Sequence, residues 1–365
     1  MPGMLALLPY HWSNAMIRFL LRAAAWLAAG LAVLAALGWG WYQSFDLDNA
    51  PKANPHASAA SLPYLKNAVG ERRGRILVVV SSAARGGPNN RKAGYELTEL
   101  ARAYYVFQAN GYEVDIASPA GGKPQERIDL DDMGDTDYAF LNDTAAQAKV
   151  RRSMKLADAD PALYSAVYFV GGKGAMFDFP GNADITRLVR AIGARGVVAA
   201  VCHGPAALAD VFLADGTPLL AGRRVTGFSN EEELFMDEEA RANFGFLLQD
   251  RAVANGARFV AGPKFIDNTV ADGRLVTGQN SWSTWSTAEG VIAALGHVPV
   301  PREPSAEEQS VRVLAAYYSG GFAAARAAQE RVAQFDKMLV LMHAVVAAME
   351  WRLADAFQLQ RLANR

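Results

Sequence analysis

The chain has 365 residues and a nearly balanced charge, with 36 lysines and arginines against 37 aspartates and glutamates. This length is enough for one large α/β domain with appendages or for two small domains. No block of basic residues stands out, so we expect no nucleic-acid partner. The single cysteine excludes an internal disulfide and a cysteine-rich metal site, and no cluster of metal ligands is visible, so we predict no metal site.

An uncharged apolar run, Ala23 to Tyr42, dominates the N-terminal region. Twenty helical residues span about 30 Å, the thickness of a bilayer core. Arg18 and Arg22 precede the run, and positive charge favours the cytoplasmic side. We therefore predict a cytoplasmic segment over 1–22 and a signal anchor over 23–42, with the remaining chain on the extracytoplasmic, periplasmic side of a single-pass membrane protein.

Two other interpretations of this run stay open. A cleaved signal peptide would have an apolar core of about 7–15 residues and a nearby small-x-small site. The string Ala57-Ser58-Ala59 has that pattern but lies far downstream. A buried core helix would need packing partners, whereas a polar stretch rich in proline, asparagine and alanine follows. We predict that residues 43–70 form a linker.

Short apolar runs alternate with helical patterns over residues 71–300. The clearest helix runs from Gly94 to Asn110, and Gly111 ends it. This alternation predicts an α/β domain with a doubly wound, mostly parallel sheet, whose active site lies at the carboxyl ends of the strands. The predicted strands are Arg75–Val80, Glu113–Ala117, Ser165–Val170, Gly196–Val201, Arg224–Thr226 and Arg274–Thr277, and two further predicted helices are Asp184–Ile192 and Asp237–Asn255.

The single cysteine, Cys202, lies where a predicted strand gives way to a helix. A strand, a sharp turn and a helix form a nucleophile elbow, which lifts the thiol off the sheet edge. Gly204 permits the tight turn, and Pro205 suits the first position of a helix. We expect the helix N-terminus to lower the pKa of the thiol. The alternative is a buried structural cysteine.

A cysteine nucleophile also needs a base and a site for an oxyanion. Of the five histidines, only His203 is expected near the sulfur. The turn Gly171-Gly172-Lys173-Gly174 follows a predicted strand and can direct its backbone N–H groups at an oxyanion. We expect Gly204 to line the same pocket. An ordinary glycine turn between a strand and a helix remains the alternative.

Six strings carry a family resemblance from about Arg75 to Leu295. The chain resembles the PfpI / class I glutamine amidotransferase-like superfamily, and within it the glyoxalase III (heat-shock protein 31-like) branch. This resemblance implies a flavodoxin-like sandwich with a Cys-His-acid triad. The strings are Gly94–Leu100, Ala117–Gly122, Gly171–Asp178, Ala200–Pro205, Thr226–Glu233 and Asp272–Asn280.

The resemblance assigns Cys202 as the nucleophile and His203 as its basic partner. It assigns Glu233 as the acid of the triad, with Glu231 and Glu232 as competitors if the register slips.

Glu99 matches the carboxylic acid that touches the sulfur in the family. Helical periodicity alone would leave this residue on the solvent side, about 200° around the helix from Leu97. A carboxyl group beside a thiolate should have a raised pKa and hydrogen-bond as the neutral acid.

The chain departs from the branch at two positions. Lys173 stands where the branch usually has histidine, and Ala103 stands where it tends to have proline. An ammonium group at Lys173 can favour an anionic substrate, or it can simply point to water. The loss of proline is expected to affect only the shape of the helix.

A helical C-terminal extension is predicted over residues 301–365. Ser305 to Glu308 form a capping box that starts a helix, and Gly320-Gly321 break it. A second, longer helix is predicted from about Phe322 to near the end. Its uncharged run Met338–Met349 is too short to span a bilayer, so we expect packing on the domain or a homodimer contact, with an interfacial helix as the alternative.

The resemblance implies a cofactor-free, glyoxalase III-like lyase (hydro-lyase) in which Cys202 attacks a small 2-oxoaldehyde of the methylglyoxal type and a hydroxy acid is released. Three alternatives stay open: a chaperone-like stress protein, a cysteine peptidase or amidase, and a membrane-tethered redox sensor. Glutamine hydrolysis is disfavoured because no histidine lies between His203 and His297.

Overall fold

The computed structural model describes residues 14–43, 45 and 52–364. The chain divides into two compact units. The larger unit is Pro51–Phe335, and the smaller unit combines Met1–Ala50 with Asp336–Arg365.

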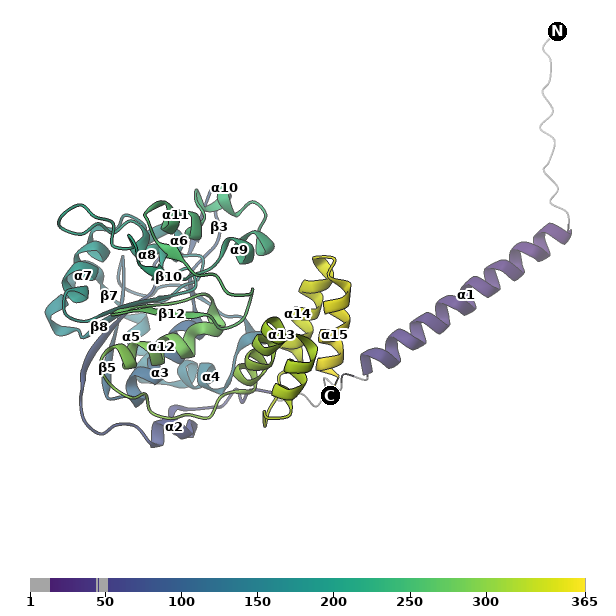
Figure 1. Ribbon diagram of the computed structural model, residues 1–365, viewed down its shortest axis with the longest axis horizontal. Coiled ribbons are helices and arrows are strands. Elements are labelled where there is room, and N and C mark those ends of the chain that lie inside the picture. The colour runs from purple at the N-terminus through teal and green to yellow at the C-terminus, as the bar shows by residue number, and fades with distance from the viewer. Residues whose placement is uncertain (1–13, 44, 46–51, 365) are drawn as a thin grey trace, which may run out of the picture. The chain divides into compact units, whose positions relative to one another are not determined.

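A sheet forms the centre of the larger unit (Figure 1). It has seven strands in the order β12-β13-β9-β8-β1-β5-β7. All neighbouring pairs in this sheet are parallel except β12 and β13, which pair antiparallel at one edge. The predicted doubly wound α/β architecture is therefore confirmed. The strands are β1 (Gly74–Val79), β5 (Tyr112–Ser118), β7 (Met154–Lys155), β8 (Ala166–Phe169), β9 (Val197–Val201), β12 (Thr269–Asp272) and β13 (Leu275–Gly278).

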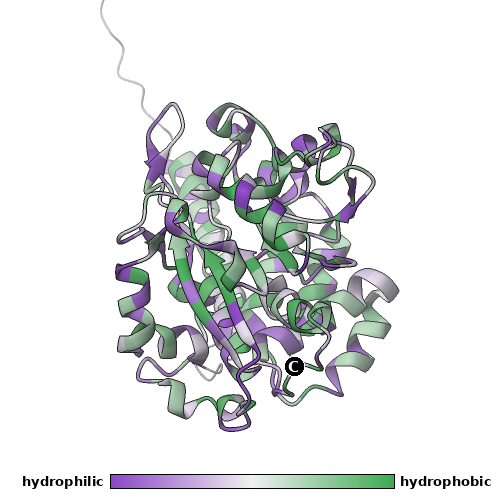
Figure 2. Ribbon diagram, turned by 90° about the vertical axis from the view of Figure 1, so that its left-hand side faces the viewer, coloured by the Kyte–Doolittle hydropathy of each residue, from purple (hydrophilic) through white to green (hydrophobic). Residues whose placement is uncertain are grey.

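Helices cover both faces of this sheet, on opposite sides of the strands in Figure 1. Successive side chains of a strand point to opposite faces, so Ile76 and Val78 of β1 join one hydrophobic core while Leu77 and Val79 join the other. The central strands are largely hydrophobic (Figure 2). One layer contains α3 (Leu97–Ala109), α4 (Asp135–Asn142), α5 (Thr144–Arg151) and α12 (Thr284–Ala294), and the other contains α7 (Ala183–Gly193), α8 (Ala206–Ala209) and α11 (Leu248–Ala254).

Short elements complete the larger unit. They are α2 (Pro63–Lys66), β2 (Arg85–Gly86), β3 (Arg91–Lys92), β4 (Tyr95–Glu96), β6 (Glu126–Arg127), α6 (Ala175–Asp178), β10 (Arg224–Val225), α9 (Asn230–Met236), α10 (Ala240–Phe244) and β11 (Arg258–Phe259).

Two predicted elements differ from the structure. The strand predicted at Arg224–Thr226 lies outside the main sheet, because β10 pairs with β11 in a separate two-stranded sheet. The helix predicted over Asp237–Asn255 is divided into α10 and α11, because Gly245 adopts a left-handed conformation with φ 82° and ends α10.

The C-terminal helices also differ from the prediction. The helix α13 (Ala306–Gln329) begins at the Ser305 capping box and is interrupted at Gly321, as predicted. The single longer helix predicted after it is wrong, because two helices form, α14 (Lys337–Met349) and α15 (Leu353–Ala363). Asp336 caps the start of α14, and Trp351, with φ 60°, lies in the turn between the two helices.

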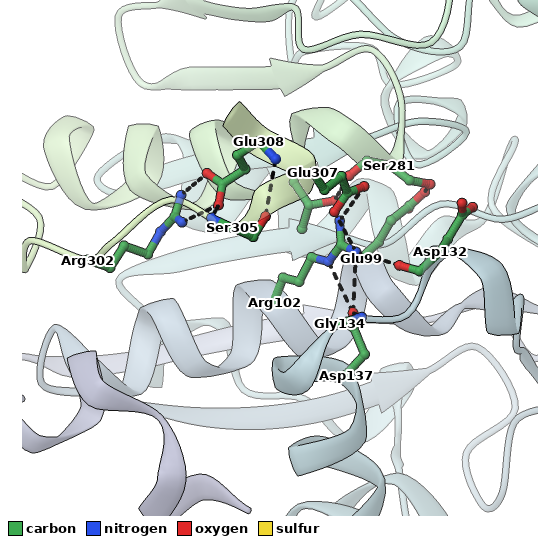
Figure 3. Close-up of polar contacts among 11 residues, drawn as sticks. Glu99, Arg102, Asp132, Gly134, Asp137, Ser281, Arg302, Ser305, Glu307 and Glu308 are labelled. Carbon is green, nitrogen blue, oxygen red and sulfur yellow. Dashed lines mark hydrogen bonds and ion pairs between the residues drawn. The ribbon is translucent and has the colours of Figure 1, made fainter. Parts of the chain in front are cut away.

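The C-terminal boundary of the α/β unit also differs from the expected boundary near residue 300, because α13 belongs to this unit. Arg102 of α3 is buried and forms an ion pair with Glu307 at the start of α13, at 3.0 Å. The same guanidinium contacts Asp137 at 3.3 Å and donates to the Asp132 carbonyl at 2.9 Å (Figure 3). Because this ion-pair network fastens α13 to α3, the α/β unit extends to Phe335.

The smaller unit contains α1 (Asn14–Gln43), and the predicted span 23–42 lies inside this helix. Its segment Met16–Gln43 is long and apolar enough to cross a bilayer, and none of its most apolar window is buried. A buried core helix is therefore not what this segment forms. A membrane span and a signal sequence both fit a helix with these properties.

Candidate active site

Cys202 lies at a strained corner between β9 and α8. Strand β9 ends at Val201, and Cys202 itself has φ 59°, a left-handed conformation that is uncommon for residues other than glycine. Its N–H donates to the Gly278 carbonyl of the neighbouring strand at 2.9 Å. A Cβ at Gly204 would overlap the carbonyl oxygen of Phe169 and lie 2.8 Å from that of Val201. The predicted strand, turn and helix therefore meet at the sulfur.

His203 connects the sulfur to a buried carboxylate. Its Nδ1 lies 3.4 Å from Cys202 Sγ, and its Nε2 lies 2.7 Å from Oε2 of Glu233. The imidazole stacks on Phe228, with ring centroids 4.5 Å apart. All three polar side chains are buried, so the orientation of the imidazole is fixed by the carboxylate and the aromatic ring together.

The structure distinguishes the three successive glutamates of α9. Glu233 contacts His203, whereas Glu232 accepts hydrogen bonds from the N–H and hydroxyl of Ser229, at 3.0 and 2.9 Å, and so caps its own helix. Glu231 is exposed and pairs with Lys264 at 3.4 Å. Only the third position of the string therefore meets the imidazole.

Glu99 is fully buried beside the sulfur. Its Oε2 accepts the Gly171 N–H at 2.7 Å, its Oε1 accepts the Ser281 hydroxyl at 2.9 Å, and its carboxyl also hydrogen-bonds Cys202. Burial raises the pKa of Glu99 to about 7. Periodicity placed this residue on a solvent face, but α3 is covered nearly all around, and Gln108 alone among its residues is not buried.

The pKa of the Cys202 thiol is raised, not lowered as we expected from a helix N-terminus. Burial is the larger cause, and the neighbouring Glu99 carboxylate adds to it because it disfavours a second negative charge. The Gly172 N–H donates to the sulfur and lowers the pKa, but its effect is smaller. The helix α8 has four residues, too few to outweigh the loss of water. Since burial raises the pKa of both groups, the Cys202–Glu99 pair retains at least one proton at neutral pH.

The glycine turn divides its backbone N–H groups between two tasks. Gly171 donates to Glu99, whereas Gly172, with φ 88°, donates to the sulfur. The Gly204 N–H is used within the elbow, where it donates to the Val201 carbonyl at 2.7 Å. Lys173 is exposed. Of the four predicted pocket residues, Gly172 is therefore the one whose backbone N–H is directed at the sulfur.

Sequence reasoning missed Ser281. This residue comes directly after the last motif string, whose strand β13 lies next to β9 in the sheet. A hydroxyl at the carboxyl end of the neighbouring strand was the available signal, because such residues meet at the same edge of a parallel sheet. Phe228 lies inside a motif string, but nothing in the sequence showed that its ring supports His203.

Known proteins share this architecture. The family model described as the DJ-1/PfpI family matches residues 91–292. Glyoxalase 3 of Candida albicans is 33% identical over 217 residues, which cover 56% of this chain and 91% of that protein. The glutathione-independent glyoxalase HSP31 of Saccharomyces cerevisiae is 34% identical over 221 residues, which cover 56% and 90%.

A solved structure agrees with the sequence relatives. The crystal structure of glyoxalase III from Candida albicans has a TM-score of 0.57 and 28% identity, and the match covers 62% of this chain and 98% of that chain. The matched family model covers more than half of the residues, which include six of the seven strands of the sheet, all except β1, and the elbow described above. The chain belongs to the DJ-1/PfpI family.

Proposed function

We propose that this protein is a membrane-tethered, cysteine-dependent glyoxalase of the glyoxalase III type, which converts a small 2-oxoaldehyde to a 2-hydroxy acid without glutathione. The observation that carries the proposal is the continuous series of contacts from Glu99 through Cys202 and His203 to Glu233. The glyoxalase relatives support the choice of substrate.

The first step forms a bond between the Cys202 sulfur and the aldehyde carbon. The thiol proton leaves the sulfur, and the former carbonyl oxygen takes up a proton, so that a neutral hemithioacetal results. His203 suits this exchange because its Nδ1 faces the sulfur while Glu233 holds its Nε2. The Gly172 N–H, which donates to the sulfur, is the backbone donor that we assign to the developing negative charge on the former carbonyl oxygen.

The second step moves a proton between adjacent carbons. A base removes the proton from the carbon that bears sulfur, the neighbouring ketone oxygen is protonated, and an enediol forms. Reprotonation at the second carbon and loss of the hydroxyl proton at the first give a 2-hydroxyacyl thioester. Glu99, with a pKa of about 7, is suited to both taking and returning a proton near neutral pH. Water then cleaves the thioester, which releases the hydroxy acid and restores the thiol, with no net oxidation.

The tether is the second part of the proposal. The uncharged part of the exposed helix α1 follows Arg18 and Arg22, which lie near the start of the same helix. We therefore assign α1 as a signal anchor that places the catalytic domain on the extracytoplasmic side. Protease accessibility in intact and broken cells tests this orientation.

Turnover of methylglyoxal by the full chain in nanodiscs, without glutathione, tests the chemistry. We expect lactate to form with the wild type and with Glu231→Gln, which changes an exposed glutamate two residues from Glu233. We expect no lactate above background with Cys202→Ala. Turnover by the wild type that does not exceed that of Cys202→Ala would refute the proposal.

A further inference from the structure

The smaller unit exposes an apolar surface that no catalytic role explains. Helix α14 carries an apolar stripe, defined here as Met338, Met342, Val345 and Met349. At 100° per residue these four positions lie within about 60° of one another on the helix. Met338, Val345 and Met349 are each more than half exposed, and Met342 is partly exposed.

The opposite face of the same helix is buried, at Leu339, Val340 and Ala347 among others, and α14 packs against α15. From Met338 to Met349 the helix has no charged residue. A surface helix normally has a polar face toward water. Because α14 is apolar on both its buried and its exposed faces, its exposed stripe fits a nonaqueous environment.

The turn between α14 and α15 continues this surface. Trp351 is 86% exposed there, and the nearby Leu353 and Phe357 of α15 are also more than half exposed. The charges at this turn are paired with one another, since Arg352 contacts Glu350 at 2.9 Å and Asp355 at 2.7 Å. An exposed tryptophan with large apolar neighbours and neutralised charge is typical of segments in the headgroup region of a bilayer.

The helices α14 and α15 form a helical hairpin, and the start of this hairpin is hydrogen-bonded to the chain just beyond α1. Lys337, the first residue of α14, donates from Nζ to the carbonyl oxygen of Phe45 at 3.0 Å, and Phe45 lies two residues beyond the last residue of α1. Phe45 is buried and its ring meets Trp41 edge-on. The hairpin therefore starts where the apolar helix ends, and its 13-residue first helix reaches about 20 Å from that point.

We propose that the α14–α15 hairpin lies in the interface of the bilayer that α1 spans, with the apolar stripe and Trp351 in contact with lipid. The inference rests on the proposal that α1 is a membrane anchor. The protein is then attached to the membrane in two ways. The helix α1 spans the bilayer, and the hairpin lies in the interface on the side where α1 leaves the membrane.

Fluorescent probes on single cysteines in the full chain test the proposal. The background is Cys202→Ala, which removes the only native cysteine. Val345→Cys and Trp351→Cys report on the hairpin, Leu31→Cys reports on α1, and Ala157→Cys is an exposed control on the α/β unit. All four positions are exposed, so the substitutions should leave the fold intact, and circular dichroism checks that they do.

Each variant is labelled with an environment-sensitive fluorophore and reconstituted in nanodiscs with or without spin-labelled lipid. We expect the probes at 345 and 351 to emit at shorter wavelength than the probe at 157, and spin-labelled lipid to quench them at least twofold more. Probes at 345 and 351 that resemble the probe at 157, while the probe at 31 is quenched, would overturn the hairpin proposal and leave the anchor intact.

Two further outcomes separate the remaining explanations. An unquenched probe at 31 would overturn the anchor and with it the hairpin proposal. Shifted emission at 345 and 351 without lipid quenching, together with disulfide crosslinking between copies of the unlabelled Val345→Cys variant, would assign the stripe to a homodimer contact instead and overturn the lipid assignment.

Discussion

Replacing Glu99 by glutamine should make the stability of the protein less sensitive to pH. Glutamine keeps the shape of the side chain, can accept the Gly171 N–H and can hydrogen-bond the Ser281 hydroxyl, so the folded structure should persist. It cannot ionise. The substitution therefore isolates the cost of placing a carboxylate in this buried position.

The size of the effect follows from the pKa of Glu99, which burial raises from 4.5 to about 7. Because the folded-state pKa is the higher one, the carboxyl contributes stability that is fully present below pH 4.5 and is lost as the pH rises through 7. At 1.36 kcal/mol per pH unit, the loss amounts to about 3 kcal/mol. Relative to the wild type, Glu99→Gln should therefore be about 3 kcal/mol more stable at pH 8 than at pH 4.

Urea unfolding of the solubilised full chain between pH 4 and pH 8 measures this difference. The exposed Glu231→Gln is the matched control and should follow the wild-type curve. If the curves for the wild type and Glu99→Gln stay parallel within about 0.5 kcal/mol over this range, Glu99 does not have the raised pKa on which the reasoning depends. In the turnover assay, Glu99→Gln should lower kcat by about 10²–10⁴-fold, because the amide cannot shuttle a proton.

Three further predictions test separate parts of the site and the fold. Glu233→Gln should lower kcat for methylglyoxal by about 10²-fold or more with little change in stability, because the amide cannot stabilise a protonated His203; equal turnover would remove Glu233 from the mechanism. Gly204→Ala should destabilise the domain by about 3 kcal/mol or more in urea unfolding, because its Cβ would overlap the Phe169 carbonyl, whereas Gly70→Ala, whose Cβ would meet nothing within 4 Å, should be nearly neutral. Arg102→Met should cost about 3–5 kcal/mol, because it leaves the buried Asp137 and the partly buried Glu307 without their partner, and adding Glu307→Gln should recover part of that loss; additive effects would contradict the ion-pair network.

The elements that could be predicted are those in which an apolar run in the sequence corresponds to a buried strand in the structure. Strands β1, β8 and β9 are short apolar runs that stay buried along the sheet, so composition alone revealed them. The edge strand β12 is only partly buried and alternates less clearly, and it was missed. The turn at Trp351 has a positive φ without glycine, so no residue type indicated that the last helix would divide there.

The candidate site was predicted by two different kinds of evidence. The elbow at Cys202 follows from the strand, the glycine and the helix around it. Glu99 followed only from the family resemblance, because helical periodicity cannot show that a helix is covered on nearly every side. The raised pKa of the thiol could not be predicted either, since it depends on how completely the surrounding elements exclude water.

The ion pair between Arg102 and Glu307 has a consequence for how the α/β unit is delimited. Any shortened chain that stops near residue 300 would uncover the guanidinium and leave Asp137 as its remaining acidic neighbour. Arg102 is three residues beyond Glu99 on the same helix, so the disturbance would fall about one helical turn from Glu99, which contacts Cys202. An inactive fragment of that length would therefore say little about the intact protein, and α13 should be retained whenever the α/β unit is studied in isolation.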